Sequence, residues 1–124
     1  MSQTPRTKKI SRAEWAEDAD AWKGHVLGDR LDSDVCILFY ATDETGKGPS
    51  LHVHPYDEIF IIRRGRARFT VGDRVIEAGE GDVVLGPANI PHKYENIGDG
   101  PLESTDIHLS RTWIQTDLED PDAQ

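Results

Sequence analysis

The chain has 124 residues, of which 36% are hydrophobic. It contains 14 Lys and Arg and 23 Asp and Glu, which gives a formal net charge of -9. The length fits one domain, and the acidic balance argues against partners that present phosphate, such as nucleic acids and anionic membrane surfaces. No apolar run approaches the roughly 20 residues of a membrane span, and the basic N-terminus lacks the apolar stretch of a secretory signal. Cys36 is the single cysteine, so we expect a cytoplasmic protein without an internal disulfide.

The segment 11–22, SRAEWAEDADAW, predicts a short helix near the N-terminus. Ser11 and Glu14 have the spacing of a capping box, and Trp15 and Trp22, seven residues apart, would lie on one helical face. We expect this face to pack against a larger body. Residues 1–24 are therefore predicted to form an arm with one short helix.

The middle of the chain, residues 25–112, predicts a single β domain. Apolar residues alternate with polar ones, and turn residues separate the runs. The predicted strands are 34–41, 51–62, 67–71, 74–77, 82–86, 92–96 and 103–110. His25 precedes them and is expected at the surface. Many short strands without intervening helices indicate an antiparallel sandwich or barrel. Residues 113–124 are predicted to be a tail, in which Trp113 and Leu118 could anchor a short helix or an arm.

The stretch 51–60, LHVHPYDEIF, contains a possible metal site. In a strand, His52 and His54 point to the same side, and Glu58 follows four residues later. Two neutral imidazoles and a carboxylate suit a divalent transition metal. On this stretch alone, two solvated histidines and a surface acid explain the pattern equally well. His92 lies in a later strand, from which a closed barrel would supply a fourth ligand.

Two longer patterns around these histidines resemble the motifs of the cupin family. The first cupin motif is a glycine, five residues, His-x-His, three or four residues, a glutamate, six residues and a glycine, and it is filled from Gly46 to Gly65. The second is a glycine, five residues, Pro-x-Gly, two residues, a histidine, three residues and an asparagine, and it runs from Gly81 to Asn96. Asn89 stands where the second motif has its inner glycine. Because asparagine tolerates left-handed backbone angles, we expect this turn to be kept.

The resemblance implies a fold and a ligand set. The fold is all-β, the double-stranded β-helix or jelly-roll barrel of cupins, here with the short N-terminal helix added. Inside it, one divalent metal would be bound by His52, His54, Glu58 and His92. Iron, manganese, nickel, zinc, cobalt and copper all accept such ligands. Cupin barrels of this size commonly pair, so we expect a homodimer.

The resemblance does not imply a reaction, because cupins include dioxygenases, isomerases, epimerases, decarboxylases, lyases, storage proteins and ligand-binding domains. We expect a metal-dependent enzyme of the dioxygenase, isomerase or lyase type that acts on a small organic molecule. The alternative is a non-catalytic module that binds a small molecule.

Two further residues are candidates for catalysis. Tyr94 has the same parity as His92, so it would line the cavity or donate a proton, although simple packing fits equally well. His108 shares a strand face with Asp106 and Ser110, and it would be an acid or base near neutral pH if that face looked inward. Because these two neighbours are small and polar, we expect His108 to point outward. The apolar lining is expected from Phe60 and Ile62.

Overall fold

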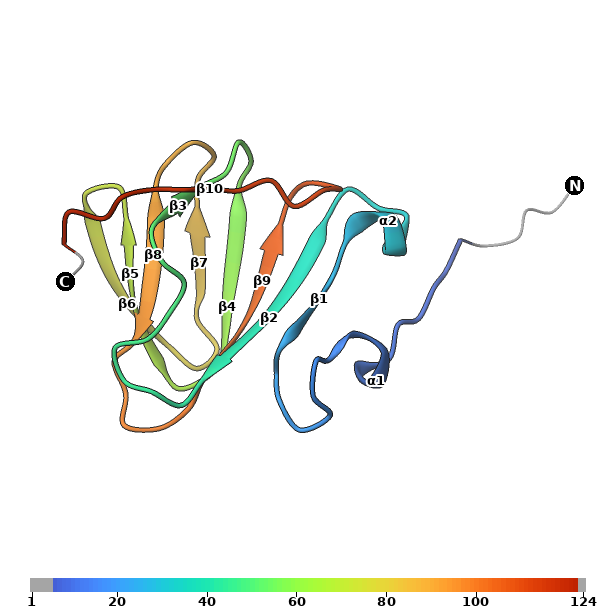
Figure 1. Ribbon diagram of the computed structural model, residues 1–124, viewed down its shortest axis with the longest axis horizontal. Helices are drawn as coiled ribbons and strands as arrows, with labels where there is room; N and C mark the ends of the chain where they lie inside the picture. The colour runs from blue at the N-terminus through green and yellow to red at the C-terminus, as the bar shows by residue number, and fades with distance from the viewer. Residues whose placement is uncertain (1–5, 123–124) are drawn as a thin grey trace, which may run out of the picture.

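The computed structural model describes residues 6–122, and these form two five-stranded antiparallel sheets that face each other (Figure 1). The first sheet has the order β1-β2-β9-β4-β7 and the second the order β10-β3-β8-β5-β6. This confirms the predicted all-β jelly-roll. The strands are β1 Gly24–Val26, β2 Cys36–Thr42, β3 His52–Val53, β4 Glu58–Arg64, β5 Arg66–Val71, β6 Arg74–Gly79, β7 Val83–Gly86, β8 His92–Asn96, β9 Leu102–His108 and β10 Thr116–Asp117.

The space between the sheets is apolar over most of its length and polar at one end. The alternation along the strands turns Phe60 and Ile62 of β4 toward Phe69 of β5 and the other core residues, all buried. At the start of β4 the buried side chain is Glu58, and in β9 its register partner is His108. Ionisable groups therefore gather where these strands meet one end of the sandwich.

The predicted helix over 11–22 is wrong in its length. The helix α1 covers only Arg12–Trp15, and a β-bridge joins Ala16 to Gly24. The reason is tertiary packing, since Trp15 stacks on Phe39 of β2 with 3.6 Å between ring centroids. Trp22 contacts both rings edge-on. The tryptophans thus pack on the first sheet around Phe39, as expected, but not from one helical face.

Two predicted strand boundaries also differ. The first strand, β1, already contains His25, whose side chain is exposed, and the short helix α2, Gly28–Leu31, follows it. The predicted strand 51–62 is divided into β3 and β4 by a turn that begins after Val53.

The C-terminal arm, which we define as residues 109–122, crosses one end of the sandwich, at the top of Figure 1. Its strand β10 pairs with β3, so that Asp117 lies opposite His52. Trp113 is 44% exposed and Leu118 37% exposed. Both side chains are partly exposed, and the arm is also held by ion pairs of Arg111 with Asp29 and Asp32 and of Asp120 with Lys93.

The outermost parts of the predicted arm and tail, residues 1–5 and 123–124, lie outside the described residues. Between residues 6 and 122, no helix has the length and apolar character needed to cross a membrane.

Candidate metal centre

Four side chains of the two motifs meet at the polar end of the sandwich. His52 lies in β3 and His54 just after it, while Glu58 begins β4 and His92 begins β8. They are 1–5% exposed, and one potential ligand atom from each lies within 4.8 Å of the others. The structure therefore brings together all four of the expected metal ligands. We refer to them as the metal centre.

Backbone contacts between the two motifs hold this arrangement. His52 and His92 are register partners in β3 and β8. The loop before β8 is tied to His54, whose carbonyl accepts a hydrogen bond of 2.7 Å from the Asn89 N–H. Asn89 has a φ of 65°, so the turn keeps the left-handed conformation that was expected of asparagine in place of glycine.

The three histidines of the metal centre all contact a backbone carbonyl through Nδ1. Because a carbonyl only accepts, each Nδ1 carries a hydrogen, and Nε2 of each neutral ring keeps a free lone pair. Contacts of this kind orient metal-binding histidines. The three Nδ1–O distances are 2.6 Å for His52 to Ser50, 2.7 Å for His54 to Ile114 and 3.2 Å for His92 to Ile90.

Glu58 lies between the imidazoles. Its Oε1 is 3.0 Å from Nε2 of both His54 and His92, and its Oε2 is 2.9 Å from Nε2 of His108. Burial alone would raise the pKa of this carboxyl, but the three histidines outweigh it and hold the pKa well below its usual range. Glu58 is therefore a carboxylate, the form that binds a cation.

The donor set fits a metal ion. A neutral His92 cannot donate at Nδ1 and Nε2 together, and Nε2 of His54 is buried without a hydrogen-bond partner among the described residues. Lone pairs of nitrogen and oxygen thus face each other, and a cation between them would remove their repulsion.

Burial lowers the pKa of His52, so its ring is neutral as coordination requires. Burial also opposes charge on His54, but Glu58 and the Ile114 carbonyl raise its pKa. A proton therefore competes with a metal at His54.

His108 points inward, which corrects the expectation that it lies outside. It is 1% exposed, and its Nδ1 is 2.7 Å from the hydroxyl of Tyr56. Of the small polar neighbours on its face, Asp106 is buried with it and Ser110 is half-buried. The expectation failed because these side chains find partners inside the protein, His108 with Glu58 and Tyr56, and Asp106 with Tyr94 through one of its two oxygens.

Tyr56 and the C-terminal arm extend this network. The N–H of Ile114 donates to the Tyr56 hydroxyl at 3.1 Å, while the carbonyl of Ile114 accepts from His54. The backbone of one arm residue thereby connects a histidine of the metal centre with the partner of His108. Burial raises the pKa of Tyr56 to about 12, so this phenol is neutral and can donate a hydrogen.

Tyr94 is buried at 2% exposure and belongs to a second polar group. Its hydroxyl donates to Oδ2 of Asp106 at 2.7 Å and lies 2.8 Å from the hydroxyl of Ser104. Burial, followed by the charge of Asp106, raises the pKa of Tyr94 well above its usual value.

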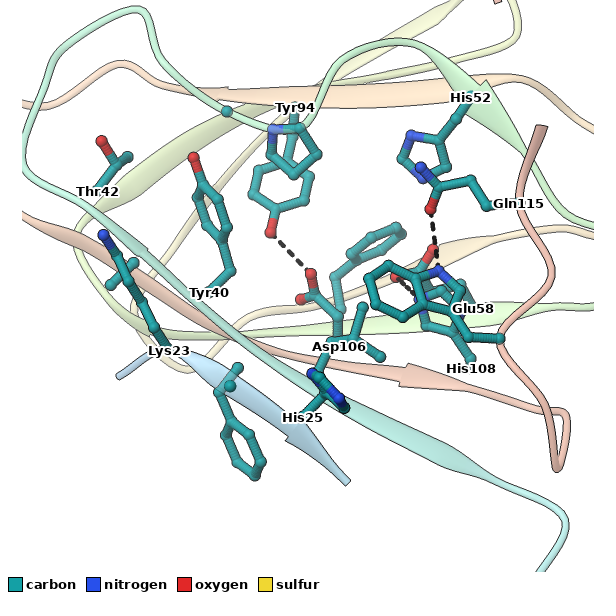
Figure 2. A pocket seen from close by; sticks show the side chains of 18 of the residues that line it. Lys23, His25, Tyr40, Thr42, His52, Glu58, Tyr94, Asp106, His108 and Gln115 are labelled. Carbon is teal, nitrogen blue, oxygen red and sulfur yellow. Dashed lines mark hydrogen bonds and ion pairs between the residues drawn. The ribbon is translucent and has the colours of Figure 1, made fainter. Parts of the chain in front are cut away.

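A cavity of about 800 Å³ opens beside the metal centre (Figure 2). Phe60 lines it as expected, whereas Ile62 belongs to the hydrophobic core. Figure 2 shows Tyr94 and Asp106 between Tyr40 on one side and His52, Glu58 and His108 on the other. Further lining comes from Lys23, His25, Tyr40, Thr42, Trp113 and Gln115.

Sequence reasoning missed three groups of this site. Asp106 shares its strand face with His108, so correct placement of that face would have found both. Tyr56 lies inside the first motif but outside its fixed positions. The Ile114 carbonyl is a backbone atom, and no residue pattern predicts it.

Comparisons with known proteins agree with this geometry. A family model described as "Cupin domain" matches residues 39–108. An uncharacterized protein of Streptomyces coelicolor is 34% identical over 65 residues, 52% of this chain and 61% of the relative. One from Methanocaldococcus jannaschii is 39% identical over 59 residues, 47% of each chain. This chain thus aligns with about half to three-fifths of the length of these relatives.

Solved structures with a similar fold include oxalate decarboxylases. A Bacillus subtilis oxalate decarboxylase with Mn(II) centres has a TM-score of 0.71 and 26% identity, over 77% of this chain and 27% of that one. A Lactobacillus farciminis oxalate decarboxylase in complex with formate has a TM-score of 0.69 and 22% identity, over 76% of this chain and 30% of that one. At this level the second likeness concerns the fold alone.

Proposed function

The chain belongs to the cupin family, whose domain model covers more than half of it, and from this premise we propose that it is a metal-dependent enzyme acting on a small organic molecule. The observation that carries the proposal is the convergence of three imidazoles and one carboxylate beside a cavity of about 800 Å³.

In this proposal His52, His54, Glu58 and His92 hold one divalent metal. When bound, the metal would supply a Lewis acid, or a redox centre of the dioxygenase type. The chain's own groups prepare the site. Backbone carbonyls hold the hydrogen of each imidazole on Nδ1. The lone pair of Nε2 is therefore free on the opposite side of the ring.

The donor set supports a catalytic ion in preference to a structural one. Structural zinc sites are closed and mostly rich in cysteine, whereas none of the four residues is a cysteine. Two of the ligands, His52 and His92, lie on strands that are paired by backbone contacts. The cavity also reaches the centre, since His52 and Glu58 line it.

The similar Bacillus subtilis enzyme supports a choice of first probes. It is an oxalate decarboxylase with Mn(II) centres, and this chain matches 27% of its length. Manganese and small carboxylic acids therefore belong in the first screen, together with the other metals and with phenols and sugars.

The test is a turnover screen on the protein loaded separately with each divalent metal. Oxygen consumption, carbon dioxide release and the NMR spectrum of each compound would be followed. Turnover that disappears in Glu58→Gln and persists in His25→Ala would support the proposal, because His25 lines the same cavity but is exposed and outside the metal centre. A compound that binds the loaded protein and is never converted would favour a non-catalytic binding module instead.

We also propose that the chain forms a homodimer. The outer face of the first sheet supports this. Val83 and Leu85 of β7 are 64% and 53% exposed, and Leu85 lies in one register row with Ile59 and Ile107. A second copy presents the same apolar face, as a two-fold symmetric interface requires.

A further inference from the structure

We propose that the cavity contains a second polar subsite, formed by Asp106, that binds an oxygen atom of a small organic acid whose other end reaches the metal centre. This inference rests on the proposed function, since it names the class of molecule on which the metal centre would act. It concerns residues outside both sequence motifs.

The subsite consists of a buried carboxyl group with one unused oxygen. Asp106 is 4% exposed and lines the cavity. Its Oδ2 accepts the Tyr94 hydroxyl, drawn as a dashed line in Figure 2. Its Oδ1 is also buried, and the part of the chain between residues 6 and 122 offers it no hydrogen-bond partner. A purely structural role explains the hydrogen bond that Oδ2 accepts from Tyr94. It leaves Oδ1 without a partner, which costs free energy in a buried site.

The hydrogen of the carboxyl group belongs on Oδ1. Burial, followed by the charge of Glu58, raises the pKa of Asp106 to about 8, against the opposing effect of Tyr94 and Ser104. In the metal-free protein the group is therefore mostly neutral at pH 7, and burial, the larger of the two causes, does not depend on the metal. Tyr94 has a single hydroxyl hydrogen, which it gives to Oδ2, so the acid's own hydrogen is free to point from Oδ1 toward a ligand. The remaining titratable groups around the cavity are Glu17, Lys23, His25, Tyr40, Glu44, Lys47, His52 and His108.

A donor at this place selects an acceptor oxygen on the ligand. Glu58 is paired with His108, and Asp106 with Phe60, two residues further along the same strands. This separation is roughly 7 Å, so a chain of a few non-hydrogen atoms would reach from one site to the other.

Charge favours an anion among such ligands. A divalent ion with Glu58 as its only carboxylate retains one positive charge. The neutral Asp106 adds no negative charge that would cancel it. Elsewhere on the cavity wall the charges balance, because Lys23 and Lys47 are matched by Glu17 and Glu44. The class that fits is a small acid with oxygen atoms at both ends.

The test measures binding of three probes, oxalate, malonate and succinate, to the Co²⁺-loaded protein by calorimetry at pH 7. Asp106→Leu should weaken binding of the best probe about tenfold or more, since a hydrogen bond to a charged group is lost. Asp106→Asn keeps an N–H donor and should stay within about threefold of the parent. Glu103→Gln is the matched control, because Glu103 lies on the same strand with the opposite parity, and it should bind like the parent.

Three outcomes would overturn the inference. Equal affinity in all variants would mean that Asp106 does not touch the ligand. Tighter binding by both Asp106 variants would mean that an ionised carboxylate repels it. Failure of the cobalt-loaded parent to bind any of the three probes would exclude the ligand class.

An infrared difference spectrum between the parent and Asp106→Asn keeps the inference testable if Asp106→Leu does not fold. At pH 7 the metal-free parent should show the carbonyl band of a protonated carboxyl, and its absence would contradict the inference. This measurement needs no metal. It therefore separates a failure of the Asp106 subsite from a failure of the proposed function, in which cobalt itself would not bind.

Discussion

Nε2 of His54 and Oε1 of Glu58 lie 3.0 Å apart in a buried site, and no hydrogen bond joins them. The hydrogen of the imidazole is engaged on its other side, where Nδ1 meets the Ile114 carbonyl at 2.7 Å. Two lone pairs therefore face each other, and Nε2 of His54 is shielded from solvent. A proton or a metal ion between them makes this contact favourable, and the contact therefore supports the proposed cation site.

The C-terminal arm should control metal affinity through this contact. Deletion of residues 113–124 removes the Ile114 carbonyl and leaves His54 Nδ1 and Tyr56 without their partner. Loss of such outer contacts costs about 10–100-fold in metal affinity, which calorimetric titration with Co²⁺ would measure. Deletion of residues 118–124 is the matched control, since it keeps Ile114 and β10. Equal affinity in the two truncated proteins would contradict the prediction.

Asp106 should make stability fall as pH rises. Its pKa is about 8 in the folded protein and about 3.9 in an unfolded chain. Between these values the folded state holds a proton that the unfolded state releases, so the contribution of this group to stability is present at low pH and is lost as pH rises toward about 8.

Asp106→Asn cannot titrate, so its unfolding free energy relative to the parent should rise with pH across this window, by at most about 1.4 kcal/mol per pH unit. Urea denaturation at about pH 5 and about pH 8 in metal-free protein would measure it. The control Glu103→Gln should show no such trend. A difference between Asp106→Asn and the parent that stays constant with pH would refute the assignment.

Removal of the metal should leave the fold intact. The strands that carry His52 and His92 are paired through their backbones, and protons can replace the ion between Glu58 and the imidazoles. We therefore expect chelation to cause little loss of far-ultraviolet circular dichroism and a modest fall in melting temperature. Unfolding on chelation would show that the ion is structural.

The homodimer should depend on the outer face of the first sheet. Leu85→Glu places a charge on this face, next to Ile59 in register, and should convert the dimer to a monomer in sedimentation equilibrium. Val75→Glu is the control, since Val75 is 62% exposed but lies on β6 of the other sheet. A parent that sediments only as a monomer at micromolar concentration would exclude the dimer.

The alternation along the strands predicted an antiparallel sandwich or barrel, whereas the resemblance of the two motifs to those of cupins predicted the jelly-roll and the four converging side chains. His52 and Glu58 lie in strands of different sheets, so they converge because of the turn between β3 and β4 and not because they share one strand face. Asn89 keeps the turn of a glycine. The side of the barrel that His108 faces could not be predicted, because parity relates residues to one another and not to the core. The helix over 11–22 failed because contacts with Phe39, distant in sequence, override local propensity.

We propose that His52, His54, Glu58 and His92 together bind one divalent metal ion. Anomalous diffraction from a crystal loaded with Co²⁺ tests it most directly, because it locates the ion without assumptions about ligands. We predict a single strong peak per chain, about 2.0–2.2 Å from one nitrogen of each histidine and one oxygen of Glu58. A fully loaded crystal with its peak elsewhere, or with none at these four residues, would contradict the account.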